Sequence, residues 1–209
     1  MARLTIVTWH WGTKYGPEYV ERLRCGLSFG PSHRFLVARP DAGDEPLLPG
    51  CLVRLKMFDP AWQAANGIEP GERIVCIDLD CVITGSLFGL FNRPEPFTIL
   101  QGVNTSNPCP FNGSLWMLEA GYRPDVWREF SLERAAKVPF HSFPDDQAWL
   151  AEMIPDAGAF GPEDGVYAFQ KRGWPKGEAL PKGARIVCFP GWRDPSQYVR
   201  LDWVAEHWR

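Results

Sequence analysis

Short apolar runs alternate with stretches of helical periodicity through residues 1–85. After Pro17, a residue tolerated in the first turn of a helix, apolar residues recur at the spacing of one helix face as far as Leu27. The expected strands are Leu4–Thr8, Arg34–Ala38, Cys51–Leu55 and Arg73–Cys81, and the expected helices start at Pro17 and span Pro60–Ala65. This alternation predicts an α/β fold with a mostly parallel, Rossmann-like sheet flanked by helices.

The pattern becomes less regular after Gly85, where short apolar runs stand among Pro, Asn and Gly. The strands expected there are Phe97–Leu100, Ser114–Leu118, Val166–Gln170 and Arg185–Phe189, and the helices are Pro124–Lys137 and Pro144–Ile154. No internal repeat, low-complexity tract or linker interrupts the chain. We therefore expect one domain over residues 1–209, with a loop-rich C-terminal half.

Composition narrows the class of protein. The 209 residues are 45% hydrophobic and 22% charged, and the net charge of -3 does not favour binding to a bulk polyanion. No segment approaches the length of a membrane span, and the N-terminus has the pattern of a strand rather than of a signal peptide. The six cysteines lie mostly in apolar runs without metal-site spacing, which is typical of reduced core residues. A cytoplasmic protein is the expectation.

Two acidic residues interrupt the strongest apolar run. Asp78 and Asp80 stand two apart, so within one strand they would project from the same face. Two buried carboxylates without partners would be costly or would hold protons, and a divalent cation such as Mg²⁺ or Mn²⁺ removes that cost. The alternative is that the strand ends at Ile77 and the two acids cap the turn that follows.

Two classes of enzyme have Asp-x-Asp after an apolar strand. In haloacid-dehalogenase-like phosphatases the motif opens the first strand and continues to a Thr, whereas here about 75 residues precede it and Val82 stands in that place. In nucleotide-sugar glycosyltransferases of the GT-A fold, the motif follows a nucleotide-binding α/β segment of about this length. The second class fits the chain better.

Six stretches carry a resemblance to one family: "TIVTWHWGTKYGPEYVERL", "RLKMF", "IDLDCVITGSLFGLF", "FNGSLWML", "FPDDQAWLAEM" and "IVCFPGWRDP". In this order the chain resembles small bacterial and phage nucleotide-sugar glycosyltransferases of the GT-A fold, related to the glycogenin-type retaining group. The resemblance implies that residues 1–85 form the nucleotide-binding half and that residues 86–209 form the sugar and acceptor half.

The resemblance also implies roles for individual residues. The donor-binding residues would be Thr8, Trp9, His10, Trp11, Lys14, Tyr15, Arg54, Asp78, Leu79, Asn112, Gly113 and Gly191. Asp78 and Asp80 would bind the metal, with Asp194 as a further candidate, and Asp146, Gln147 and Arg193 would be catalytic. Each residue also has a purely structural interpretation, such as a core Trp, an exposed strand charge at Arg54, or a turn at Asn112.

The last stretch departs from the family pattern. Pro190 stands where the family has a metal-binding His, and Asp194 stands where it has a Lys that contacts the diphosphate. Arg193 could supply the lost positive charge, and Asp194 could supply a metal oxygen. His10 and His141 are other conceivable ligands.

The function expected from the resemblance is metal-dependent transfer of a sugar, most simply from a UDP-sugar, to an acceptor hydroxyl with retention at the anomeric carbon. The acceptor would be a glycan, a protein or a hydroxymethylated base in phage DNA. DNA would call for a basic stripe, for which "FQKRGWPK" and "YVRLDWVAEHWR" are the candidates. The alternatives are a haloacid-dehalogenase-like phosphatase and a non-catalytic nucleotide-sugar-binding module.

Overall fold

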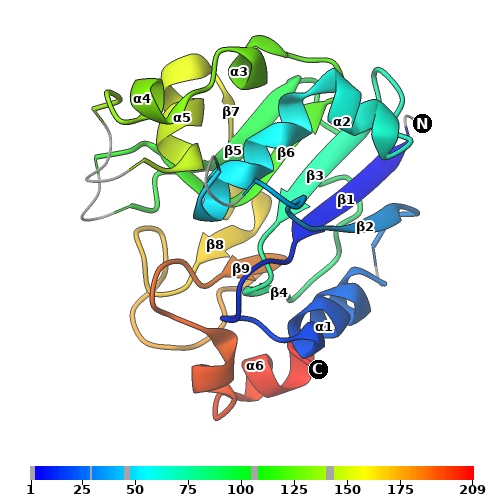
Figure 1. The fold of residues 1–209 in the computed structure, drawn as a ribbon. Coiled ribbons are helices and arrows are strands. Elements are labelled where there is room, and N and C mark those ends of the chain that lie inside the picture. The colour runs from blue at the N-terminus through cyan, green and yellow to red at the C-terminus, as the bar shows by residue number, and fades with distance from the viewer. Residues whose placement is uncertain (1–2, 29, 45–47, 105–107, 140–143) are drawn as a thin grey trace.

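A six-stranded sheet runs through the middle of the molecule (Figure 1). The computed structural model describes residues 3–28, 30–44, 48–104, 108–139 and 144–209, so His141 lies outside the described residues. The strand order is β2-β1-β3-β6-β5-β7. The bounds are β1 Leu4–Trp9, β2 Arg34–Ala38, β3 Arg73–Ile77, β5 Phe97–Gln101, β6 Phe111–Glu119 and β7 Gly158–Phe160. In this sheet only β6 runs against the others, which confirms the mostly parallel arrangement.

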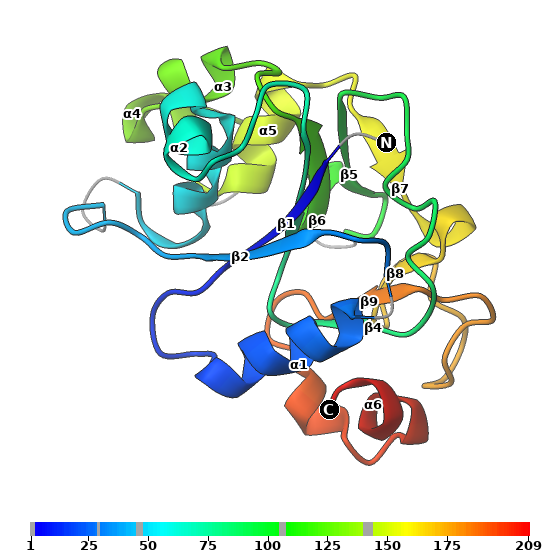
Figure 2. The same ribbon diagram turned by 90° about the vertical axis from the view of Figure 1, so that its right-hand side faces the viewer.

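One face of this sheet packs against a second, three-stranded sheet and two helices (Figures 1 and 2). The small sheet has the order β4-β9-β8, with β4 Cys81–Ile83, β8 Val166–Ala168 and β9 Ile186–Cys188. The helices are α1 Pro17–Leu27 and α6 Asp202–His207. Val20, Leu23 and Leu27 of α1 are buried in this layer, as their helical spacing predicts.

Short helices cover the opposite face of the six-stranded sheet (Figures 1 and 2). They are the 3₁₀ helix η1 Gly50–Phe58 and the α-helices α2 Pro60–Ala65, α3 Asp125–Arg128, α4 Leu132–Ala135 and α5 Asp146–Met153. Along β3, Ile74 and Cys76 join the core on this face, while Val75 and Ile77 join the core on the other. Both faces of β3 are therefore buried, which explains its unbroken apolar sequence.

The predicted strand Arg73–Cys81 is two strands in different sheets. β3 ends at Ile77, residues 78–80 form a turn, and Cys81 begins β4. The turn is closed by a hydrogen bond from the Cys81 N–H to the Asp78 carbonyl oxygen at 3.1 Å. The prediction that Asp78 and Asp80 share one strand face is therefore wrong, because two fully buried strands have no periodicity that would reveal the break between them.

Two further predicted elements differ in the structure. Cys51–Leu55 was expected as a strand and lies in η1, since a short apolar run does not distinguish a buried strand from a buried helical segment. Pro124–Lys137 is two short helices, because Ser131 begins a new helix by accepting a hydrogen bond from the Arg134 N–H at 3.2 Å. β7 and α6 were not expected.

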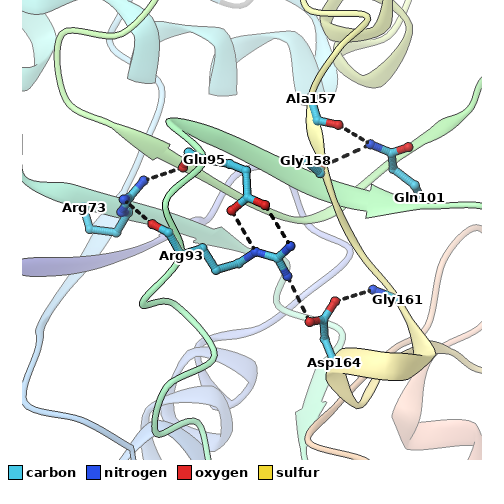
Figure 3. Close-up of polar contacts among 8 residues, drawn as sticks. All are labelled: Arg73, Arg93, Glu95, Gln101, Ala157, Gly158, Gly161 and Asp164. Carbon is cyan, nitrogen blue, oxygen red and sulfur yellow. Dashed lines mark hydrogen bonds and ion pairs between the residues drawn. The ribbon is translucent and has the colours of Figure 1, made fainter.

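Polar contacts hold the edge strand β7 and the short 3₁₀ helix η2, Pro162–Asp164, to the loop before β5 (Figure 3). The Arg93 guanidinium forms ion pairs with Glu95 and with Asp164. Arg73 donates to the main-chain carbonyls of Arg93 and Glu95, and Gln101 donates to two carbonyls at the start of β7.

No helix among the described residues is both long enough and apolar enough to span a membrane.

Candidate active site

A cavity of about 410 Å³ opens at the carboxyl ends of β1 and β3. Because β6 runs antiparallel, its first residues reach the same edge of the sheet. The N-terminus of α5, part of η1 and the segment after β9 close the remaining sides. The lining residues are Trp9, Trp11, Lys14, Tyr15, Cys51, Arg54, Asp78, Leu79, Asp80, Asn112, Gly113, Ser114, Asp145, Asp146, Gln147, Pro190 and Gly191.

Arg54 joins two acidic residues of the cavity wall. Its side chain is only 5% exposed, forms an ion pair with Asp78, and places Nη2 2.6 Å from Oδ2 of Asp146. Burial alone would lower the pKa of Arg54, but the charges of Asp146 and Asp78 outweigh burial and raise the pKa above its ordinary value. Burial also raises the pKa of Asp146 to about 6, although Arg54 acts in the opposite direction. Arg54 is therefore a buried cation that fixes two carboxylates.

Asp80 is a buried carboxylate whose hydrogen-bonding capacity is only partly used. Its Oδ2 accepts a 2.6 Å hydrogen bond from the Tyr15 hydroxyl, and among the described residues its Oδ1 has no hydrogen-bond partner. Burial and then the negative charge of Asp78 raise the pKa of Asp80 to about 7, against the lowering effects of Tyr15 and Lys14. A bound cation would give the Asp80 Oδ1 a partner and would stabilise the ionised carboxylate.

The loop after β1 brings aromatic rings to the cavity. Trp9 is buried and stacks on Trp62 with ring centroids 5.6 Å apart, while Trp11 and Tyr15 also line the cavity. His10 does not line it; its Nε2 donates a 2.9 Å hydrogen bond to the carbonyl of Tyr15 and so braces the loop. Burial and the Asp80 charge raise the pKa of Tyr15, which keeps its hydroxyl protonated as a donor.

The first residues of β6 meet the N-terminus of α5. Asp145 caps this helix by accepting a 2.8 Å hydrogen bond from the Ala148 N–H, which leaves Asp146 and Gln147 in the first turn beside the cavity. Gln147 Oε1 accepts from the Gly113 N–H at 3.2 Å. A Cβ at Gly113 would lie 2.6 Å from Nη2 of Arg54, so only glycine allows this close approach.

The segment after β9 closes the cavity with Pro190 and Gly191. The φ angle of Gly191 is 83°, a value that favours glycine, and its carbonyl accepts a 3.4 Å hydrogen bond from Lys14 Nζ. Asp194 instead caps the 3₁₀ helix η3, Pro195–Tyr198, and accepts a hydrogen bond from the Tyr19 hydroxyl at 2.8 Å. This structural role accounts for Asp194 without a metal.

The residues that could hold a divalent cation are few. In the described part of the chain, no three or more His, Cys, Asp or Glu side chains gather closely enough to form a metal site. Of the four carboxylates that line the cavity, Asp145 caps α5 and Asp146 is buried against Arg54. Asp78 is partly exposed, and Asp80 has an oxygen that lacks a partner among the described residues. Two carboxylates suit Mg²⁺ or Mn²⁺ when substrate phosphates and water complete the coordination shell. The pair fits a metal held jointly with a diphosphate.

The structure brings most of the candidate residues together. The members of the proposed set that line the cavity are Trp9, Trp11, Lys14, Tyr15, Arg54, Asp78, Leu79, Asp80, Asn112, Gly113, Asp146, Gln147 and Gly191. Four others are not among the lining residues: Thr8, His10, Arg193 and Asp194. Thr8 is fully buried within β1, because its side chain points from the strand into the protein interior.

Four lining residues were not among the candidates: Pro190, Asp145, which caps α5, and the two described next. Cys51, expected to be a core residue, lies on the cavity wall, and burial raises the pKa of its thiol. Ser114 lines the cavity from β6, and its N–H donates to the Asn112 side-chain oxygen at 3.2 Å. Neither position carries a signal in the sequence, since an isolated Cys or Ser in an apolar run has the pattern of a core residue.

Comparison of the sequence with protein-family models and with curated proteins finds no match. The structure is similar to that of a glycosyltransferase involved in glycosylation of the major capsid of PBCV-1, with a TM-score of 0.57, 15% identity, and coverage of 90% of this chain and 93% of that one. Apo GlyE from Streptococcus pneumoniae TIGR4 gives a TM-score of 0.62 at 14% identity over 99% of this chain and 63% of GlyE. The galactosyltransferase LgtC, solved with donor and acceptor sugar analogues, gives 0.58 at 8% identity over 97% and 96%.

The chain has a GT-A-type glycosyltransferase fold. This confirms the fold class expected from the sequence. At identities of 8% to 15% the similarity establishes the architecture, so the chemistry has to be argued from the cavity of this chain itself.

Proposed function

We propose that this chain is a metal-dependent glycosyltransferase that moves a sugar from a nucleotide donor, most simply a UDP-sugar, to an acceptor hydroxyl with retention at the anomeric carbon. The observation that carries the proposal is Asp80. It is a buried carboxylate with an oxygen lacking a partner, beside Asp78, in the cavity of a glycosyltransferase fold. A buried polar atom without a partner calls for an explanation, and a bound cation supplies one for Asp80 Oδ1.

The cavity wall divides into regions that suit the parts of such a donor. Trp9, Trp11 and Tyr15 supply flat apolar surface for a nucleobase. Asp78 and Asp80 would hold the cation that accompanies the diphosphate, and Lys14 adds a positive charge beside Gly191. A bound Mg²⁺ or Mn²⁺ would neutralise the diphosphate and stabilise the negative charge that develops on it as it leaves.

The sugar would then face the N-terminus of α5. Gln147 already accepts from Gly113 with its Oε1, which leaves its side-chain N–H groups to donate to sugar hydroxyls. Asn112 offers a second amide to the sugar. Asp146, held by Arg54, offers a carboxylate to the positive charge that would develop on the sugar in the transition state. The arrangement supports an electrostatic role for Asp146 in the transition state.

The reaction breaks the bond between the anomeric carbon and the phosphate oxygen and forms a bond from that carbon to the acceptor oxygen. The acceptor proton leaves with the departing diphosphate. Arg54 does not contact phosphate in this scheme, because its guanidinium is already engaged by Asp78, Asp146 and the Gly113 carbonyl. Its role is to position the two carboxylates.

The test is hydrolysis of a panel of nucleotide sugars in the presence of Mn²⁺, measured as release of the free nucleotide. We expect release from at least one donor, loss of release with EDTA, and loss in Asp80→Asn. Asp156→Asn serves as the matched control, because Asp156 is exposed and outside the cavity lining. Equal turnover by Asp80→Asn and wild type would sink the metal role.

A non-catalytic nucleotide-sugar-binding module remains the second candidate. It is favoured by Pro190, which supplies no metal ligand, and by the lack of a three-ligand cluster among the described residues. Thermal stabilisation by a nucleotide sugar without turnover, across the donor panel, would support it. The phosphatase alternative has less support, because the fold is that of glycosyltransferases.

A further inference from the structure

Trp192 is an exposed indole next to the cavity. Ten tryptophans occur in the chain, and Trp192 is the one whose side chain is largely in solvent, at 70% exposed. It directly follows Gly191, which lines the cavity, but it is not itself a lining residue. An exposed Trp beside a binding cavity is a common feature of ligand recognition, because its large flat surface gains most from being covered.

The exposure of Trp192 does not come from a loose chain end. Phe189 before it is fully buried and stacks on Phe169 with centroids 4.8 Å apart. Asp194 after it is 8% exposed and is fixed by hydrogen bonds to the Tyr19 hydroxyl and the Ser196 N–H. The segment is therefore held on both sides while it presents its indole outward.

One face of the Trp192 indole is in contact with the guanidinium of Arg193. The Arg193 guanidinium carbon lies 4.9 Å from the centroid of the Trp192 ring, a cation–π contact. This contact orients the ring and leaves its other face for a ligand. Nε of Arg193 is buried without a hydrogen-bond partner in the described part of the chain, so the guanidinium is packed against the protein.

We propose that Trp192 is the platform on which the acceptor binds and that the acceptor is a glycan whose pyranose ring stacks on the indole. This inference rests on the proposed glycosyl transfer. The donor's base, diphosphate and sugar are provided for by residues that line the cavity, which leaves the rim beyond Gly191 for the acceptor. A sugar offers an apolar C–H face to the free face of the indole.

A nucleic-acid acceptor fits the charge of this chain less well than a glycan does. The chain carries a net charge of -3, and DNA binding draws most of its affinity from cationic contacts with phosphates. Near Trp192 and Gly191, the Arg193 guanidinium is stacked on the indole and Lys14 donates to the Gly191 carbonyl. Stacking of a sugar ring on the indole does not depend on such cationic contacts.

The experiment compares transfer with donor hydrolysis for wild type, Trp192→Ala and Trp192→Phe. A tagged nucleotide sugar that the chain hydrolyses is offered to a glycan array with Mn²⁺ present, and the ratio of transfer to hydrolysis is measured for each variant. We expect this ratio to fall about 10- to 100-fold in Trp192→Ala and to be largely restored in Trp192→Phe. Phe88→Ala is the matched control, because Phe88 is 63% exposed but lies outside the cavity lining.

The outcomes separate the two proposals. Donor hydrolysis with an unchanged ratio in Trp192→Ala overturns the role of Trp192 and leaves the glycosyltransferase standing. Donor hydrolysis with transfer to no glycan, or with transfer only to hydroxymethylcytosine DNA or to peptides, overturns the glycan acceptor. If wild type neither binds nor hydrolyses any nucleotide sugar, the proposed function fails and this inference fails with it.

Discussion

Replacing Asp80 by Asn should make the metal-free protein more stable at pH 8. The folded Asp80 has a pKa raised from 3.8 to about 7, chiefly by burial and then by the charge of Asp78. Between these two values the unfolded chain has lost its proton and the folded chain has kept it, so stability falls as the pH rises from about 4 to 7. Each pKa unit corresponds to about 1.4 kcal/mol, and the ionised carboxylate therefore costs the fold about 4 kcal/mol at pH 8.

Asn removes this charge and retains an oxygen that can accept from the Tyr15 hydroxyl. For a chain of this length 1 kcal/mol shifts the melting temperature by about 2–4 °C, so Asp80→Asn should melt about 8–16 °C higher than wild type in EDTA at pH 8. The difference should shrink toward pH 5, where wild type is protonated. Thermal unfolding across this pH range measures the effect.

Addition of Mn²⁺ supplies the complementary result. The cation replaces a proton on Asp80, so it should stabilise wild type more at pH 8 than at pH 6, and it should not stabilise Asp80→Asn appreciably. If Asp80→Asn melts below wild type at pH 8 in EDTA, the carboxylate is not a destabilising group and the reasoning is refuted.

Three further substitutions test contacts among other residues that line the cavity. Tyr15→Phe removes the hydrogen bond that lowers the pKa of Asp80, so half-maximal stabilisation by Mn²⁺ should move to higher pH; an unmoved pH profile would contradict this contact. Gly113→Ala places a Cβ 2.6 Å from Nη2 of Arg54 and should cost about 1–3 kcal/mol in urea unfolding, whereas a change below 0.5 kcal/mol (about the scatter of neutral substitutions) would show that the wall yields. Arg54→Met leaves Asp146 buried without its partner and should cost about 3–5 kcal/mol at pH 8, with partial recovery at pH 5; equal losses at both pH values would argue against the ion pair.

Elements with strong local signals could be predicted closely. Arg34–Ala38 and Pro60–Ala65 have the predicted bounds, the second because Pro opens the helix and the Asp59 side chain accepts from the Ala61 N–H. β7 has three residues and α6 has six, and neither carries enough periodicity to stand out from a loop. The break after Ile77 is hidden for the opposite reason, since both strands beside it are buried.

The residues of the candidate site could also be predicted only in part. Motifs such as Asp78–Asp80 and Asp146–Gln147 could be found because their residue types are unusual in their local pattern. The contacts between motifs could not be found, because Arg54 with Asp146 and Tyr15 with Asp80 join segments that are far apart in the chain. The sequence pattern predicted that Asp78 and Asp80 share one strand face. In the structure Asp78 pairs with Arg54, and Asp80 accepts a hydrogen bond from Tyr15.

The most direct test of the central claim is a crystal structure with UDP and Mn²⁺, with anomalous diffraction used to locate the manganese. We expect one anomalous peak beside the carboxylates of Asp78 and Asp80, in contact with the diphosphate of UDP, and the uracil against the wall of Trp9, Trp11 and Tyr15. A diphosphate bound elsewhere, or manganese that avoids Asp80 while UDP fills the cavity, would contradict it.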